Sequence, residues 1–173
     1  MSLKNKPRQT VPLRFAVVTM SDKGFQGERE DTSGQALIEL FKYEGMELCF
    51  YRIVPDQRDS IIHSIIESID SAHADLVITT GGTGVSPSDI TPECMDELFE
   101  KEVPGIAEAM RTESFKITPR AVISRGRAGI RGQSLIINLP GSKKAALENI
   151  MVVLPALSHA IEKIKGNQDD CAT

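Results

Sequence analysis

Short apolar runs alternate with amphipathic segments along most of the chain. The runs are rich in β-branched residues and end in turns, a pattern typical of strands buried on both faces. The segments between them carry apolar residues at helical spacing, as in the isoleucine stripe of residues 61–69. The alternation predicts strands at residues 13–20, 48–54, 75–80 and 134–139. It predicts helices at residues 33–44, 57–71, 91–101, 104–119 and 143–165, the last of them interrupted or restarted at Pro155.

The connections between these elements complete the expected architecture. Residues 21–33 hold two glycines and several charges and predict a loop, while residues 121–124 and the glycine-spaced stretch 126–132 predict a small β-hairpin excursion. Thr91 and Pro92 suit the N-cap and first position of a helix. The whole pattern indicates an α/β fold, a three-layer α-β-α sandwich with a mostly parallel sheet. We expect one domain over residues 12–165, with flexible tails at 1–11 and 166–173.

The composition narrows the class of protein. The 173 residues include 20 lysines and arginines against 24 acids, a net charge of −4 that argues against a protein coating nucleic acid. Three cysteines without a CxxC pair, and three histidines without ligand spacing, predict reduced thiols and no structural zinc. The polar N-terminus and the absence of an apolar run of ~18 residues predict a cytoplasmic protein that does not cross a membrane.

The charge is unevenly distributed along the chain. Residues 111–144 carry eight lysines and arginines and one acid, so that the rest of the sequence has a net charge of −11. A local positive field of this kind attracts phosphorylated small molecules. We therefore expect the basic stretch to face such a ligand, with some of its arginines serving subunit contacts instead.

Four polar clusters follow predicted strands, at the edge of a parallel sheet where ligands bind. The sharpest is the Gly-Gly-Thr-Gly loop at residues 81–84, where glycines let the backbone approach a phosphate closely. This loop matches neither the dinucleotide-binding fingerprint nor the Walker A motif, and a tight strand-to-helix turn explains it equally well. The other clusters are Ser21 with Asp22, Asp56, and residues 138–142.

Asp56 and Asp89 are expected on one rim of the sheet, because each follows a strand. Two carboxylates there could hold Mg²⁺ against phosphate oxygens, since Mg²⁺ takes one or two protein carboxylates and keeps water and phosphate as its other ligands. The alternatives are an N-cap for Asp56 and an Asx turn for Asp89. The position of both beside the glycine loop favours the functional interpretation.

Asn138 interrupts an apolar strand, and a buried amide needs partners, either backbone or ligand. We favour a ligand for Asn138, whereas composition alone favours structural roles for Ser114 and Ser124. No arrangement of serine, histidine and aspartate, or of cysteine and histidine, indicates acyl-transfer hydrolysis.

Residues 77–93 closely resemble the signature of the molybdenum-cofactor biosynthesis fold. The families it resembles are the molybdopterin adenylyltransferases of the MogA type, the bacterial MoaB proteins and the G domains of gephyrin. The similarity extends upstream and downstream to cover nearly the whole chain apart from its tails. The further matching segments are residues 18–22, 31–34, 54–56, 101–106, 113–119, 123–125, 128–132 and 136–141.

The resemblance implies transfer of AMP from ATP to the terminal phosphate of molybdopterin, with release of pyrophosphate and with Mg²⁺ as cofactor. Asp56 and Asp89 match the essential acidic pair of the family, which is commonly trimeric, with MoaB-type members also forming hexamers. A separate molybdenum-insertion protein would use the product. Residues matching the substrate and nucleotide positions are Ser21, Asp22, Gly81, Gly82, Thr83, Gly84, Ser114, Ser124, Asn138, Pro140 and Gly141.

Two departures from the family pattern concern phosphate contacts. Ser88 stands where many relatives have a basic residue, and Ser142 is followed by Lys143 and Lys144 where others have proline. These lysines either replace the lost cation or lie on a solvated helix N-terminus. A molybdopterin-binding protein without catalysis, or a scaffold, is the alternative function.

Overall fold

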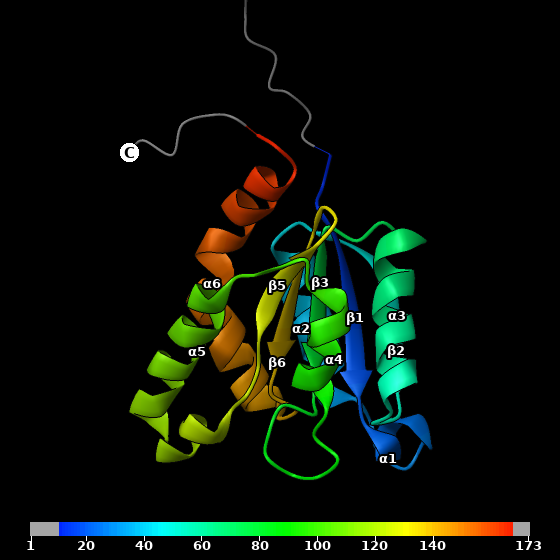
Figure 1. Cartoon of the computed structure of the whole chain (residues 1–173), viewed down its shortest axis with the longest axis vertical. Helices are drawn as coiled ribbons and strands as arrows, with labels where there is room; N and C mark the ends of the chain where they lie inside the picture. Colours follow the sequence, from blue (N-terminus) through cyan, green and yellow to red (C-terminus); the bar gives the residue numbers. More distant parts are fainter. Residues whose placement is uncertain (1–10, 168–173) are drawn as a thin grey trace, which may run out of the picture.

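The parallel strands predicted from the apolar runs are four adjacent strands of a six-stranded mixed sheet in the computed structural model, which describes residues 11–167 (Figure 1). The sheet order is β2-β1-β3-β6-β5-β4, and the first four of these strands run parallel. The strands are β1 (Arg14–Met20), β2 (Glu47–Val54), β3 (Leu76–Thr80), β4 (Lys101–Glu102), β5 (Ala128–Arg131) and β6 (Ser134–Leu139). The helices are α1 (Asp22–Phe25), α2 (Thr32–Tyr43), α3 (Arg58–Asp70), α4 (Thr91–Leu98), α5 (Pro104–Ile117), the 3₁₀ helix η1 (Pro119–Ile123) and α6 (Lys143–Ile164).

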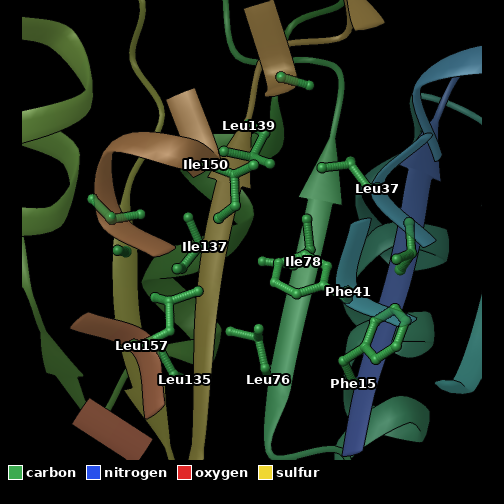
Figure 2. Packing of buried hydrophobic residues seen from close by; sticks show 14 of the residues in the cluster. Phe15, Leu37, Phe41, Leu76, Ile78, Leu135, Ile137, Leu139, Ile150 and Leu157 are labelled. Atoms are coloured by element: carbon green, nitrogen blue, oxygen red, sulfur yellow. The ribbon is translucent and has the colours of Figure 1, made fainter. Parts of the chain in front are cut away.

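Alternate residues of each central strand face opposite helical layers. Phe15 and Val17 of β1 pack with α2, α5 and α6, in the cluster that Figure 2 shows, whereas Ala16 and Val18 pack with α3 and α4. Both faces are buried, which is why these strands read as continuous apolar runs. The expected three-layer α-β-α sandwich with a mostly parallel sheet is confirmed.

The chain changes direction in the sheet between β1 and β3. It runs from β1 to its neighbour β2 and then crosses back to β3 on the other side of β1. When the connections that follow two neighbouring parallel strands lead to opposite sides of the sheet, a crevice opens between the carboxyl ends of these two strands. Here the two strands are β1 and β3. Both strands end where the long loop of residues 81–90 and helix α1 lie, at the lower end of the sheet in Figure 1.

Two of the predicted connections are wrong in detail. Residues 21–33 contain the short helix α1 rather than a continuous loop, with Ser21 as its N-cap. Residues 121–124 are not a strand, because residues 119–123 form the 3₁₀ helix η1. The hairpin is instead made by β5 and β6, which pair antiparallel around Gly132.

Helix boundaries also differ from the prediction. α4 ends at Leu98 rather than near residue 101. Thr91 is not its N-cap, because Ile90 occupies that position, and the Thr91 hydroxyl instead donates to the Gly81 carbonyl at 3.0 Å. α6 continues through Pro155 without a break. Proline has no amide hydrogen, so it cannot donate to the carbonyl of Met151, four residues earlier in the helix. Met151 is half exposed, so water can reach that side of the helix.

Among residues 11–167, α6 alone is long and apolar enough to cross a membrane by length and composition. Its buried stripe includes Ile150, Val153, Leu157 and Ile161 and packs against the sheet, as the stripe of a core helix does. Cys49 and Cys94 are free thiols, as expected. Cys171 and the predicted flexible tails, apart from residues 11, 166 and 167, lie outside the described residues.

Candidate functional site

The crevice between the ends of β1 and β3 contains a cavity of about 400 Å³. Strand β1 contributes its last residues and Ser21, and the glycine loop after β3 contributes the opposite wall. The loop after β6 adds Gly141 and Ser142. The predicted site residues in this first pocket are Ser21, Asp56, Gly81, Gly82, Asp89 and Gly141.

Gly81 and Gly82 adopt backbone conformations that other residues rarely reach, with φ of +107° and +64°. A Cβ on Gly81 would lie 2.3 Å from the Met20 carbonyl oxygen, and one on Gly82 would lie 2.4 Å from the Thr91 hydroxyl. The loop is therefore the tight turn that we considered, and the same turn forms a wall of the pocket. The two interpretations of the Gly-Gly-Thr-Gly sequence are compatible.

Asp22 and Asp56 hold each other through reciprocal hydrogen bonds. The Asp56 amide donates to the Asp22 carboxylate at 2.9 Å, and the Asp22 amide donates to the Asp56 carboxylate at 3.2 Å. The N-cap alternative for Asp56 is wrong, because Gln57 occupies that position of α3. Partial burial, together with the charges of Asp22 and Asp89, raises the pKa of the Asp56 carboxyl. A bound cation would relieve this repulsion.

Asp89 does not form the Asx turn considered as an alternative, because the Thr91 amide two residues on donates to the Gly82 carbonyl, but it closes another turn within its own loop. Its carboxylate accepts a hydrogen bond from the Ser86 amide at 2.9 Å, and its own amide donates to the Ser86 carbonyl at 2.9 Å. The loop turn is therefore real. The same residue lines the first pocket with Asp56, so the turn fixes the carboxylate at the pocket wall.

A second cavity of about 540 Å³ lies next to the first, and Ser142 lines both. Ser142 is the N-cap of α6, so the positive end of that helix lies at the junction of the two pockets. Arg111 and Arg120 also line the second pocket. The predicted site residues in the second pocket are Thr83, Gly84, Ser114, Ser124 and Pro140.

The ligand interpretation of Asn138 is not supported, because its side chain is almost fully buried and lines neither pocket. Its amide nitrogen donates to the Thr79 hydroxyl at 2.9 Å and lies 3.3 Å from the Met95 sulfur. Its carbonyl oxygen accepts from the Arg127 amide at 3.2 Å. Asn138 therefore ties β6 to β3 and to the segment before β5, and the polar partners it needs are protein groups.

The basic stretch of residues 111–144 is neutralised largely within the chain. Arg125 pairs with Glu93, Arg127 with Asp96 and Glu102 at 2.6 and 2.8 Å, and Arg131 with Asp70 at 3.2 Å. Lys144 lies 3.8 Å from Glu148, and neither it nor Lys143 lines either pocket. The solvated-helix alternative therefore fits these two lysines. No ion pair is found for Arg111 or Arg120 within residues 11–167, and these two arginines line the second pocket together with one acid, Glu148, the partner of Lys144.

Several pocket residues were not predicted from the sequence. Arg29, Asp31 and Ser33 line the first pocket at the start of α2. Asp31 is buried and accepts hydrogen bonds from Thr19, Ser33, Gly34 and Tyr51. An acid three residues before a glycine at the start of a helical pattern is a cap signal, and it could have indicated this position.

Comparison with known proteins places this geometry in a family. The family model described as "Probable molybdopterin binding domain" matches residues 16–159. The chain belongs to this molybdopterin-binding family. The resemblance noted in the sequence, from residue 77 to residue 93 and beyond, is thereby confirmed.

Relatives of this family span nearly the full length of the chain. A molybdopterin adenylyltransferase from Helicobacter pylori is 42% identical over 158 residues, covering 90% of this chain and 89% of the relative. The crystal structure of the molybdopterin biosynthesis enzyme MoaB from Thermus thermophilus is 45% identical, with a TM-score of 0.84 over 90% of this chain and 98% of that one. The tungsten cofactor synthesizing MoaB of Pyrococcus furiosus is 36% identical, with a TM-score of 0.83 over 89% and 98%.

Proposed function

We propose that this protein is a molybdopterin adenylyltransferase, which transfers AMP from ATP to the terminal phosphate of molybdopterin and releases pyrophosphate. The observation that carries the proposal is the pair of adjacent pockets that share Ser142, one lined by the predicted acidic pair, Asp56 and Asp89, and one lined by Arg111 and Arg120. A reaction between two phosphorylated substrates needs such an arrangement. The relative from Helicobacter pylori is named for this activity.

The first pocket suits the ATP phosphates, and the second suits the pterin with its phosphate. In this assignment the glycine loop and the N-terminus of α6 supply backbone polarity to the phosphates where the pockets meet. Arg111 and Arg120 would attract the phosphorylated pterin. Residues 12–165 would act as one unit.

The chemistry needs positioning more than proton transfer. The attacking phosphate is already anionic near neutral pH, so no side chain must remove a proton from it. What lowers the barrier is in-line placement of the two phosphates and neutralisation of their charge. Residues 11–167 contain no cluster of three or more acidic, histidine or cysteine side chains that could hold a metal.

Asp56 and Asp89 fit the remaining need, a cation held jointly by protein and substrate. Mg²⁺ binds through one or two carboxylates plus phosphates, and Asp56 and Asp89 line the first pocket together. Partial burial and the charges of Asp22 and Asp89 raise the pKa of the Asp56 carboxyl, and a bound cation would offset both effects. Magnesium, when bound, would neutralise phosphate charge and orient the phosphate that is attacked. Asp22 would keep Asp56 in place through their reciprocal bonds.

Membership of the family leads us to propose an oligomeric state, a cellular location and a partner protein as well. We propose a cytoplasmic homotrimer, or the hexamer of MoaB-type members, that passes adenylated molybdopterin to a molybdenum-insertion protein. We expect no nucleic acid partner and no membrane association. A tungsten pathway would use the same adenylylation step.

Pyrophosphate release with purified molybdopterin and ATP tests the activity directly. We expect turnover by the wild type and a fall of at least about 10²-fold in Asp89→Asn, which leaves the loop turn able to form. Full activity in Asp89→Asn would contradict the proposed role of the carboxylate pair. Binding of molybdopterin without any adenylated product would instead favour the non-catalytic alternative.

A further inference from the structure

Arg125 follows Ser124, which lines the second pocket, and its side chain reaches the loop that carries Asp89. Its backbone amide donates to the Thr83 carbonyl at 2.8 Å. Its guanidinium donates from Nε to the Gly84 carbonyl and from Nη2 to the Asp89 carbonyl, each at 2.6 Å. The third nitrogen, Nη1, pairs with Glu93 of α4.

These contacts close the loop from both ends. Gly84 and Asp89 are the first and last residues of an excursion whose middle, residues 85–88, is exposed. The link from Asp89 to Ser86 spans only part of that excursion. Thr91 closes the base of the loop through its amide to the Gly82 carbonyl at 3.1 Å and its hydroxyl to the Gly81 carbonyl at 3.0 Å. The guanidinium joins Gly84 to Asp89 inside this base, so it bears directly on the position of the Asp89 carboxylate. Glu93, whose pKa is lowered mainly by its hydrogen bond with Arg125, holds the guanidinium from the other side.

The geometry of the side chain explains why arginine is needed. A guanidinium presents fixed donors in one plane and can serve two carbonyls and a carboxylate at once. A lysine at position 125 could reach one or two of these acceptors but could not keep their spacing fixed. The preceding residue, Ser124, lines the second pocket, so the same short segment connects both pockets.

We propose that Arg125 is a positioning residue for the adenylyl transfer. It sets the place of the Asp89 carboxylate by holding the ends of the 84–89 loop. The inference rests on the proposed function for its catalytic consequence, and on the hydrogen bonds alone for the clamp itself. Arg125 lines neither pocket, so it acts through the loop rather than on the substrates.

The kinetic test compares Arg125→Ala with a matched control. We expect kcat to fall about 10²-fold in Arg125→Ala, because small misplacements of a catalytic group cost this much, while KM for molybdopterin changes less than about twofold. Arg125→Lys should recover part of the loss. Arg127→Ala is the control, since that side chain also binds one carbonyl and acids of α4 and the neighbouring strand but does not touch the 84–89 loop.

A double variant separates positioning from general destabilisation. If Arg125 acts through Asp89, Arg125→Ala should cost little further activity in an Asp89→Asn background, because the group it positions is already lost. An unchanged cost in that background would overturn the proposal. Equal kcat losses in Arg125→Ala and Arg127→Ala would overturn it as well.

Amide hydrogen exchange tests the clamp without any activity. The amides of Ser86 and Asp89 should exchange at least about tenfold faster in Arg125→Ala than in the wild type, and at wild-type rates in Arg127→Ala. Wild-type exchange of these amides in Arg125→Ala would overturn the clamp even if activity fell. Absence of wild-type turnover would instead count against the proposed function and its catalytic consequence, while the exchange rates would still decide on the clamp.

Discussion

Asp56 is a carboxylate that the fold surrounds with negative charge. Asp22 lies against it through two hydrogen bonds, and the charges of both Asp22 and Asp89 act on it. Partial burial is the largest cause of the raised pKa of Asp56, and these neighbouring charges add to it, so the ionised form is less stable in the folded chain than in the unfolded one. Such an arrangement is unfavourable for folding and favourable for binding a cation, which is typical of functional sites.

Replacing Asp56 with asparagine should therefore stabilise the protein at neutral pH. When folding raises the pKa of a carboxyl group, the free energy of unfolding decreases as the pH rises from the unfolded pKa value to the folded one. The melting temperature of Asp56→Asn should exceed that of the wild type at pH 7, and the difference should shrink as the pH falls below the unfolded value of about 3.9. Thermal melts of both proteins from pH 3 to pH 7 would measure this.

The effect of Mg²⁺ on the melting temperature gives a second test of Asp56→Asn. A ligand that binds the folded state raises its melting temperature, so Mg²⁺ should stabilise the wild type and not Asp56→Asn. The variant should also lose at least about 10²-fold in pyrophosphate release. A variant that is less stable than the wild type at pH 7 but equal to it at pH 3 would contradict the sign of the shift.

At the scale of elements, the start of α2 shows how a helix is fixed beside the first pocket. The buried Asp31 caps the helix by accepting from the Gly34 amide at 2.8 Å, and it also accepts from the hydroxyls of Thr19 and Tyr51. Burial and the bond to Asp31 raise the pKa of Tyr51 to about 12, so the tyrosine stays a donor at neutral pH. The cap thus links α2 to β1 and β2.

Gly34→Ala should reverse the usual preference for alanine in a helix. Alanine normally stabilises a helical position by up to about 1 kcal/mol relative to glycine. At Gly34 its methyl group would lie 2.1 Å from the Asp31 carboxylate and 2.7 Å from the Thr19 hydroxyl. The cap must shift, and we expect a loss of about 1–3 kcal/mol in the free energy of unfolding, measured with denaturant.

Gly105 is the control for this substitution, because it also lies in the first turn of a helix. Nothing lies within 4 Å of a Cβ built on Gly105. Gly105→Ala should leave the stability unchanged or raise it by up to about 1 kcal/mol. If both variants moved in the same direction, the steric argument at Gly34 would be wrong.

At the scale of the whole molecule, the features predicted correctly from the sequence are those that local periodicity determines. The four parallel strands and the helices between them follow from apolar spacing, and the meeting of Asp56 and Asp89 follows from parallel topology. The hairpin was misplaced because residues 121–123 are apolar yet lie in η1, where Val122 and Ile123 are exposed rather than paired. Apolar character alone does not distinguish a strand from a short exposed helix.

The hydrogen-bond and ion-pair partners of polar residues often lie in distant segments of the chain. A local sequence pattern therefore does not predict them. Asn138 is satisfied by Thr79 and by the Arg127 backbone, 59 and 11 residues away. The basic stretch is similar: Arg131 pairs with Asp70, and Arg127 with Asp96. A count of charges along the chain therefore overstates the positive field at the ligand.

The second pocket contains an exposed arginine that has no acidic partner among residues 11–167. Arg120 is exposed, lines that pocket and has no ion pair within residues 11–167, whereas Arg131 is paired with Asp70. Arg120→Ala should raise KM for molybdopterin about tenfold, corresponding to about 1.4 kcal/mol, and leave KM for ATP nearly unchanged. Because an exposed charge is screened by salt, the effect should decrease as the ionic strength rises.

Arg131→Ala removes the same formal charge from the same stretch of sequence and serves as the comparison. If net charge attracted the pterin, both variants would raise its KM equally. If only the charge of Arg120 at the second pocket matters, Arg131→Ala should keep the wild-type KM for molybdopterin at every ionic strength. The reason is that the Arg131 guanidinium of the wild type forms an ion pair with Asp70. Steady-state kinetics of both variants across a range of salt concentrations would therefore show whether the ligand responds to the charge of the segment or to the placement of one arginine.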